Sequence, residues 1–325
     1  MANSCIMKGS ATFALWLAIL SLRVSSVYGV NLQNVQHLVV FGDSLSDNGN
    51  SLALFQVPPF PYFGGRWTNG PNWVDYFPGV AYVFGVHGAP AGAYFEKYRG
   101  TNFAVGGAQS GDLLKPRVSG DGKMSFPAQI PTYLATTPGG QASADDLYVI
   151  WIGVNDFPAA PNDTVDHIKA GIDLLRVNGA RSFVVITVPD IWLTPDIISA
   201  GGATIDAAKR FVAAVNTLLQ VQIPSYASSY GIEVSLVDIN TIFDELVYNP
   251  SEFGFTNSVD AAFNPNAQIS LLNPVSDPNT YVFWDGFHPT TRAHFLAALF
   301  ISRSITSRNA FSKTRFVPPA NTLTH

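Results

Sequence analysis

Four short apolar runs lie along the chain, each with the length of a β-strand. They cover residues 38–41, 147–152, 182–188 and 233–238, with the sequences LVVF, LYVIWI, SFVVITV and EVSLVD. Each run is nearly continuous rather than alternating, which is typical of strands buried on both faces of a parallel sheet. The runs therefore predict a central, mainly parallel sheet.

Between these runs, apolar residues recur at the spacing of one helix face. One set ends at the turn signal Asn178-Gly179, and the other ends before Pro224. The two sets are Val165, Ile168, Ile172 and Leu175, then Ile205, Ala208, Val212, Val215 and Leu219. Strands that alternate with helices predict a three-layer α/β/α domain of the flavodoxin-like kind. No repeat or low-complexity linker interrupts residues 30–325, so we expect a single domain.

Residues 56–140 depart from this alternation, because they are rich in proline, glycine and aromatic residues, as in VPPFPYFGGRWTNGPNWVDYF. The segment is too long for an ordinary connection. We expect it to form loops and short helices over the carboxyl edge of the sheet, where open α/β sheets bind their ligands.

The first 29 residues have the features of a secretory signal peptide. Lys8 precedes an apolar run at 11–22, and Val27 and Gly29 stand where a signal peptidase prefers small residues. The run is too short to span a bilayer, and no later segment has the roughly 18 apolar residues of a transmembrane helix. We therefore expect a secreted, extracellular protein without stable membrane insertion; a retained membrane anchor is the alternative.

Composition narrows the chemistry of the mature chain. The single cysteine, Cys5, lies in the signal segment, so residues 30–325 have no thiol for a disulfide, a zinc site or a nucleophile. Without Lys8 and Arg23 of that segment, 16 basic residues stand against 23 acidic ones, a net charge of −7. This balance argues against a nucleic-acid partner. Asn162 begins an N-x-[ST] sequon and is a candidate glycosylation site.

The first run leads directly into FGDSLSDNGN, which places Ser44 at the carboxyl edge of the predicted sheet, at the start of the next helix. The unpaired N–H groups and the positive dipole of a helix start suit a developing oxyanion, so Ser44 is a candidate nucleophile. Serine, aspartate and asparagine are also the usual helix-capping residues, and capping is the second interpretation.

A nucleophilic serine needs a histidine as its base, and the base needs a group that orients it. His288 is the best candidate of six histidines, because Asp285 precedes it by three residues in the tight turn WDGFH. The Asp285 carboxylate would reach Nδ1 and leave Nε2 free to face Ser44. The alternative is a structural cap of a closing helix, with Pro289 in its first turn.

Two further turns contain donors for an oxyanion. Residues 102–112, NFAVGGAQSGD, have paired glycines whose backbone can approach a ligand closely, and WIGVND places Asn155 just after a strand. Each segment taken alone is also explained as an ordinary turn. Their place at the sheet edge that holds Ser44 favours one shared site.

Taken in order, FGDSLSDNGN, NFAVGGA, GVND and WDGFHPT resemble the four blocks of the GDSL esterase/lipase family within the SGNH hydrolases. The resemblance covers residues 41–290 and implies the SGNH hydrolase fold, with neither metal nor cofactor. It implies that Ser44 is the nucleophile and His288 the general base and then the acid. Asp285 would orient the imidazole.

By the same resemblance, the oxyanion would be bound by the Ser44 N–H, the Asn155 side-chain amide and a glycine N–H. That glycine aligns with Gly107, and Gly106 is adjacent to it. Two features depart from relatives: the mature chain lacks the cysteines usual in plant members, and G-x-S-x-G is absent, so the strained elbow of α/β-hydrolases is not expected.

The sequence thus predicts a secreted serine carboxylic-ester hydrolase that forms an acyl-serine. The stretch GGRWTNGPNWVDYF at 64–77 is similar to secreted plant and fungal members, including fungal acetyl esterases. This similarity favours short acyl esters of small molecules or oligosaccharides, such as acetylated plant cell-wall carbohydrates. A lipase, phospholipase or acyltransferase that acts on longer acyl chains is the alternative.

Two hypotheses belong to other classes. A non-catalytic binding protein could stack aromatic residues on a sugar or a lipid, and a metal-dependent hydrolase could use His288 and His294. The aromatic candidates are Phe60, Tyr62, Phe63, Trp67 and Trp73. Neither hypothesis needs Ser44, Asn155 and Asp285 together, so both rank below the esterase.

Overall fold

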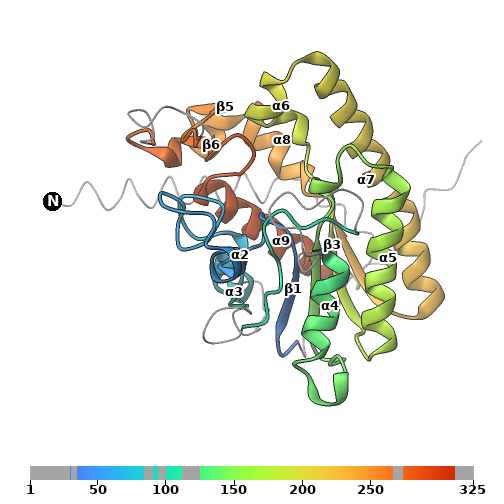
Figure 1. Cartoon of the computed structure of the whole chain (residues 1–325). Helices are drawn as coiled ribbons and strands as arrows, with labels where there is room; N and C mark the ends of the chain where they lie inside the picture. Colours follow the sequence, from blue (N-terminus) through green and yellow to red (C-terminus); the bar gives the residue numbers. More distant parts are fainter. Residues whose placement is uncertain are drawn as a thin grey trace, which may run out of the picture.

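Figure 1 shows a computed structural model of the chain. The structure describes residues 30, 35–83, 91–93, 100–111, 125–265 and 274–311. The expected signal segment, residues 1–29, lies outside this part of the chain. None of the described helices is long and apolar enough to cross a membrane.

Within the described residues, the main sheet consists of four parallel strands in the order in which they occur in the chain. They are β1 (Leu38–Gly42), β2 (Leu147–Trp151), β3 (Ser182–Ile186) and β4 (Glu233–Val237). All four agree with the predicted runs. Because the strands are parallel, the loops that follow them all start at one edge of the sheet, the carboxyl edge.

An extended segment, residues 101–105, runs along the free edge of β1. The N–H of Phe103 donates to the Val40 carbonyl at 2.8 Å, and the N–H of Val105 donates to the Gly42 carbonyl at 3.1 Å. This pairing carries the glycine pair that follows to the carboxyl edge, beside the end of β1.

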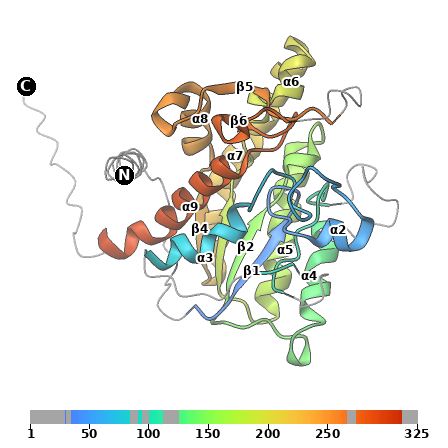
Figure 2. The ribbon, with the colours of Figure 1, turned by 90° about the vertical axis from the view of Figure 1, so that its left-hand side faces the viewer.

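Helices cover both faces of the sheet, as Figures 1 and 2 show. One face is covered by α3 (Trp73–Val83), α8 (Asn240–Tyr248) and α9 (Thr291–Phe311). The other face is covered by α4 (Phe126–Leu134), α5 (Pro161–Val177) and α7 (Gly202–Tyr230). The fold is therefore the predicted three-layer α/β/α arrangement around a parallel sheet.

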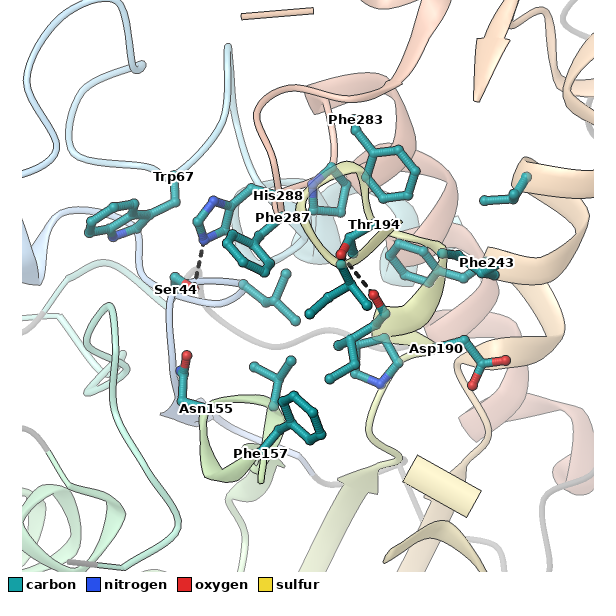
Figure 3. Close-up of a pocket in the computed structure, with 18 of the residues that line it drawn as sticks. Ser44, Trp67, Asn155, Phe157, Asp190, Thr194, Phe243, Phe283, Phe287 and His288 are labelled. Carbon is teal, nitrogen blue, oxygen red and sulfur yellow. Dashed lines mark hydrogen bonds between the residues drawn. The ribbon is translucent and has the colours of Figure 1, made fainter. Parts of the chain in front are cut away.

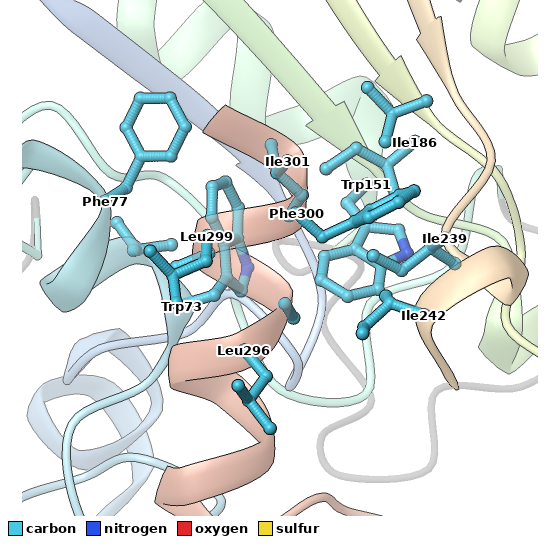
Figure 4. Close-up of a cluster of buried hydrophobic side chains, with 14 of the residues drawn as sticks. Trp73, Phe77, Trp151, Ile186, Ile239, Ile242, Leu296, Leu299, Phe300 and Ile301 are labelled. Carbon is cyan, nitrogen blue, oxygen red and sulfur yellow. The ribbon is translucent and has the colours of Figure 1, made fainter. Parts of the chain in front are cut away.

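Successive strand residues belong to two separate cores, one on each face of the sheet. In β1, Val40 packs in the core with α3 and α9, whereas its neighbour Phe41 packs in the core with α4, α5 and α7. Figure 4 shows the first of these cores, where Trp73, Trp151 and Phe300 come from three different elements. Because both faces are buried, every strand position favours an apolar residue, which explains the continuous runs.

Helix α7 differs from its prediction, because it continues through Pro224 to Tyr230. A proline inside a helix costs about 3 kcal/mol, since it removes a backbone hydrogen bond and crowds the preceding turn. Ile223 and Ala227 beside it are buried in the core, and burying one isoleucine side chain contributes roughly 1.5–3 kcal/mol. Packing against the sheet therefore offsets the cost of Pro224, and the helix ends before Gly231 instead.

The segment 56–140 is only partly as expected. Its helices α3 and α4 lie on the two faces of the sheet rather than over the carboxyl edge, because each has an apolar side that the cores bury. The loop between α2 (Asn50–Phe55) and α3 does reach the carboxyl edge, where the rings of Trp67 and His288 lie 5.4 Å apart. Residues 84–90, 94–99 and 112–124 of this segment lie outside the described residues.

A second, two-stranded parallel sheet is absent from the sequence prediction. It pairs β5 (Asn257–Ala261) with β6 (Tyr281–Phe283), and these short strands contain too few apolar residues to form a recognisable run. β6 ends two residues before Asp285 and so positions the last motif. Among the described residues, the other elements are α6 (Pro195–Ser199) and the 3₁₀ helices η1 (Pro138–Gly140), η2 (Val154–Asp156), η3 (Ile191–Leu193), η4 (Pro250–Phe253) and η6 (Pro278–Thr280).

Candidate active site

Ser44 lies two residues after the end of β1, in a tight turn at the carboxyl edge. The N–H groups of Ser46 and Asp47 close this turn by donating to the Asp43 carbonyl at 3.0 and 2.9 Å. The next helix, α2, begins only at Asn50, so Ser44 is not at a helix start as predicted. The first N–H groups of that helix are bound instead by the Asp47 carboxylate.

The turn after β6 brings His288 and Asp285 against Ser44. His288 Nε2 lies 2.9 Å from Ser44 Oγ, and His288 Nδ1 lies 2.8 Å from Asp285 Oδ2. Asp285 Oδ1 accepts the backbone N–H groups of Phe287 and His288 at 2.9 and 2.8 Å. When Nδ1 donates to Asp285, Nε2 is left to accept the Ser44 hydroxyl hydrogen.

The last motif is also tied to the loop before α3. Thr68 Oγ1 donates to the Pro289 carbonyl at 2.8 Å, and the N–H of Thr291 donates to Asn69 Oδ1 at 2.8 Å. Helix α9 begins at Thr291, so Pro289 precedes the helix rather than lying in its first turn. Pro289 forms an isolated bridge with Phe283 of β6 instead, which closes the turn.

Burial and nearby charges act in opposite directions on His288 and Asp285. Burial would lower the pKa of His288, but the charge and hydrogen bond of Asp285, with the charges of Asp43 and Asp196, raise it. Burial would raise the pKa of Asp285, but the charge and hydrogen bond of His288 lower it. Asp285 therefore stays ionised and can stabilise an imidazolium at His288.

The two adjacent glycines have different roles. The N–H of Gly106 donates to Asp47 Oδ2 at 2.9 Å and to Ser51 Oγ at 2.8 Å, so it is already used. Gly107 lines the pocket, and its φ of 79° lies in the left-handed region that favours glycine. The N–H groups of Gly107 and Ser44 donate to no described residue. Gly107, rather than Gly106, is therefore the candidate oxyanion donor.

Asn155 lies in η2, directly after β2, on the same side of the pocket as Ser44 (Figure 3). Its Nδ2 donates to the Ala108 carbonyl at 2.9 Å. An amide nitrogen has two hydrogens, so the second one remains for a ligand. The Ala108 contact also sets the orientation of the amide relative to the glycine loop.

Two buried aspartates that the sequence analysis did not single out join the motifs together. Asp156 accepts the N–H of Ser110 at 2.9 Å and the Thr164 hydroxyl at 2.8 Å. Asp47 joins the first motif to the second through Gly106. Each follows a candidate residue closely in the chain, but an aspartate in a turn is ordinarily explained as a capping residue. Its burial is visible only in the fold.

A cavity of about 350 Å³ opens beside Ser44, within the range of small-molecule sites. Figure 3 shows Ser44, His288 and Asn155 on one side, and Phe243 and Phe283 across from them. The cavity lining is mostly apolar, and many of these side chains come from the loop after β3, from α8 and from the last motif; they include Ile191, Leu193, Val247 and Phe287.

The other residues considered at the sequence level lie in different places. Trp73 is a fully buried core residue, and the Phe60 side chain is 93% exposed, whereas Tyr62 and Trp67 lie beside Asp285 and His288. His294 is buried in α9, where burial lowers its pKa to about 3. Among the described residues, no group of three or more His, Cys, Asp or Glu side chains is arranged to hold a metal ion.

Comparison with known proteins places the site in a family. The family described as GDSL-like Lipase/Acylhydrolase matches residues 38–301. The thermolabile hemolysin of Vibrio parahaemolyticus is 28% identical over 301 residues, which cover 87% of this chain and 66%, just under two thirds, of the hemolysin. A GDSL esterase/lipase of Arabidopsis thaliana is 27% identical over 338 residues, which cover 87% of this chain and 91% of that protein.

A third relative is the phosphatidylcholine-sterol acyltransferase of Aeromonas hydrophila. It is 24% identical over 311 residues, which cover 79% of this chain and 86% of the acyltransferase. The family match extends from the start of β1 into α9, so it includes all four motifs and every strand of the main sheet. The chain belongs to the GDSL-like lipase/acylhydrolase family.

Proposed function

We propose that this chain hydrolyses carboxylic esters through an acyl-serine intermediate. The observation that carries the proposal is the unbroken series of hydrogen bonds from Asp285 through His288 to Ser44, at the wall of an apolar pocket. This arrangement contains a nucleophile, its base and the group that orients the base. Asn155 and Gly107 line the same pocket as candidate oxyanion donors.

In the proposed reaction, Ser44 Oγ attacks the acyl carbonyl carbon while its proton passes to His288 Nε2. The carbonyl oxygen becomes an oxyanion, which the N–H groups of Ser44 and Gly107 and the Asn155 amide bind. The imidazolium returns its proton to the leaving alcohol oxygen as the C–O bond breaks. A water molecule that His288 deprotonates then attacks the acyl carbon. The bond from that carbon to Ser44 Oγ breaks, His288 returns the proton to Oγ, and the acid leaves.

The pocket supports an apolar acyl chain as the acid part of the ester. Phenylalanine, isoleucine, leucine and valine side chains make up much of the lining of the cavity that holds Ser44 and Phe243. Each methylene group that leaves water for such a surface contributes about 0.8 kcal/mol. A chain that extends across the pocket toward Phe243 would therefore bind more tightly than an acetyl group, which favours lipase-like or acylhydrolase activity.

The short-acyl alternative, an acetylated plant cell-wall carbohydrate, rests on the stretch 64–77. In the structure, Trp73 and Phe77 of this stretch are buried between α3 and α9, where they cannot stack on a sugar. Acyl transfer to an alcohol instead of water is the second candidate, because one relative is named as an acyltransferase. The assay below distinguishes the short-acyl alternative and acyl transfer from the hydrolysis of longer acyl esters.

The test is hydrolysis of p-nitrophenyl esters from acetate to palmitate, with Ser44→Ala as the blank. We expect wild-type rates to peak above butyrate and the variant to lose nearly all turnover. An added alcohol that captures the acyl group as a new ester would indicate transfer. Activity confined to acetate and butyrate would support acetylated oligosaccharides. Equal rates above the uncatalysed background would contradict the serine mechanism, and no hydrolysis by either protein would favour a binding protein.

We also propose that the chain is secreted after cleavage near residue 29 and that Asn162 carries a glycan. Asn162 is exposed in the first turn of α5, so an oligosaccharide could attach there without disturbing a core. N-terminal sequencing of protein from culture medium tests the cleavage, and mass before and after glycosidase treatment tests the glycan. Retention of residues 1–29 in the cell membrane would contradict secretion.

A further inference from the structure

The series of hydrogen bonds does not end at Asp285. The Tyr62 hydroxyl donates to Asp285 Oδ2 at 2.7 Å, on the same oxygen that accepts His288 Nδ1. We propose that Tyr62 is a positioning residue, which holds the Asp285 carboxylate in the orientation that His288 requires. This inference rests on the proposed function, because it assigns a role in the same site.

Four groups donate hydrogen bonds to the two oxygens of the Asp285 carboxylate. Oδ1 accepts the N–H groups of Phe287 and His288, which belong to the same turn. Oδ2 accepts the Tyr62 hydroxyl, and it shares His288 Nδ1 with Oδ1, at 2.8 Å from Oδ2 and 2.9 Å from Oδ1. The imidazole changes its charge during each turnover, so Tyr62 is the one donor to Oδ2 that stays constant. Burial raises the pKa of Tyr62, which keeps its hydroxyl protonated and able to donate.

The ring of Tyr62 is held on several sides. It makes edge contacts with Trp67, Phe263 and Trp284, at centroid distances of 5.9, 5.8 and 6.0 Å. A tyrosine that is packed in this way has little freedom to turn, so its hydroxyl is a rigid donor. Trp67 in turn lies against the imidazole of His288. One loop therefore supports both the carboxylate and the imidazole.

A purely structural role predicts a different outcome on mutation. If Tyr62 only fills space among aromatic rings, phenylalanine would replace it without consequence, because the ring is unchanged. If the hydroxyl positions Asp285, its loss leaves the imidazole as the only donor to Oδ2, so the carboxylate can shift with the ring during turnover. A hydrogen bond to a charged group contributes enough for its loss to lower kcat roughly 10- to 100-fold. KM should change little, because Tyr62 does not line the pocket.

Loss of the Tyr62 hydroxyl should also shift the pKa of His288, and the direction of this shift follows from the charges that face the imidazole. They are Asp285, Asp43 and Asp196, with His294 as the nearby basic group. The Tyr62 hydroxyl withdraws negative charge from Oδ2. Without this donor, the carboxylate attracts the imidazolium more strongly, so His288 holds its proton to higher pH. The acid limb of the kcat/KM profile should therefore move to higher pH.

The experiment compares Tyr62→Phe with Tyr226→Phe in kcat, KM and pH profile. Tyr226 is a matched control, because its hydroxyl donates to Asp173 at 2.6 Å, between α7 and α5 and away from the site. We expect only Tyr62→Phe to lower kcat and to move the acid limb. Wild-type kcat and an unmoved profile in Tyr62→Phe would overturn the inference.

A second measurement does not depend on activity. The His288 ring is titrated by NMR in Ser44→Ala, with and without Tyr62→Phe, and the titration midpoint should rise in the double variant. An unchanged midpoint would overturn the role of Tyr62. Activity retained in Ser44→Ala would refute the proposed function, and the NMR result would still stand. If Tyr62→Phe does not fold, Trp284→Phe loosens the Tyr62 ring, and a profile that stays unmoved there would contradict the inference.

Discussion

The N–H of Gly106 donates to the buried carboxylate of Asp47, and this contact joins the loop of Gly107 to the turn of Ser44. Asp47 follows Ser44 by three residues, whereas Gly106 is 59 residues further along the chain. The carboxylate uses up the N–H of the first glycine, so only the second is left to face the pocket. The two N–H groups proposed for the oxyanion thus depend on a residue that does not line the pocket.

Asp47→Asn tests this connection. Oδ1 of Asp47 accepts the N–H groups of Gly49 and Asn50, and Oδ2 accepts those of Ser51 and Gly106. An amide can accept at only one of these positions, so we expect a loss of about 1–3 kcal/mol in the free energy of unfolding, with a lower kcat. Urea unfolding measures the first effect and ester hydrolysis the second. The exposed Asp206→Asn is the control, and equal stability of the two variants would contradict the connection.

Asn155→Ala removes one proposed oxyanion donor and should lower kcat on the order of 10²- to 10³-fold, with little change in KM. The amide also donates to Ala108, so the melting temperature must be measured beside the rate. Asn178→Ala controls for the loss of an amide, because the half-buried Asn178 at the end of α5 also donates to a backbone carbonyl, that of Leu174. A folded Asn155→Ala variant with wild-type kcat would show that its amide does not bind the oxyanion.

The pH dependence follows from His288, which must be neutral to accept the Ser44 proton. The Asp285 charge raises the His288 pKa above its ordinary value of 6.5, so kcat/KM should rise with pH through a midpoint above 6.5. In Asp285→Asn, the charge that opposes the lowering of the His288 pKa by burial is lost. The midpoint of the kcat/KM profile should therefore move to lower pH. The wrong tautomer should lower kcat on the order of 10⁴-fold.

Asp196→Asn is the graded control for this prediction. It removes a weaker charge from the surroundings of His288, so the midpoint should shift downward by less than in Asp285→Asn. Its kcat should stay near the wild-type value, because Asp196 makes no hydrogen bond to the imidazole among those described. A midpoint that rises in either variant would contradict the electrostatic account.

Val247→Trp tests the acyl side of the pocket. Val247 lies one turn after Phe243 on α8, and both line the side across from Ser44. A larger ring there should lower kcat/KM for laurate or palmitate esters about tenfold or more and leave acetate nearly unchanged, because the excluded methylene groups lose their apolar contacts. The exposed Val221→Trp on α7 is the control. An equal loss for every chain length would mean that the acyl chain lies elsewhere.

Much of the fold was predictable, because its physical cause is local. A strand buried on both faces must be apolar at every position, so the four strands of the main sheet appear as continuous runs. Helix α5 ends at Asn178-Gly179 as expected, since the signal lies in adjacent residues. Helix α7 shows where local signals fail: Pro224 is a helix breaker by itself, and only packing against the sheet explains why the helix continues.

The candidate site also has a part that local sequence predicts and a part that only the packing of distant segments sets. Ser44 and Asn155 each follow a strand of the main sheet, whose parallel strands all end at one edge. Asp285 and His288 follow β6 of the second sheet, so their short motif was recognisable in the sequence but their position beside Ser44 was not. The choice between Gly106 and Gly107 was not available from these motifs. It depends on which N–H group the Asp47 carboxylate occupies.

The sequence by itself determined the layers of the fold, the family and the residue types that the proposed chemistry needs, because periodicity and short motifs are properties of neighbouring residues. Only the tertiary structure decided which glycine N–H the Asp47 carboxylate binds, that apolar side chains line the cavity, and that Tyr62 reaches Asp285 across 223 positions of the chain. Such contacts form when distant segments pack together, and no local pattern records which of them will meet.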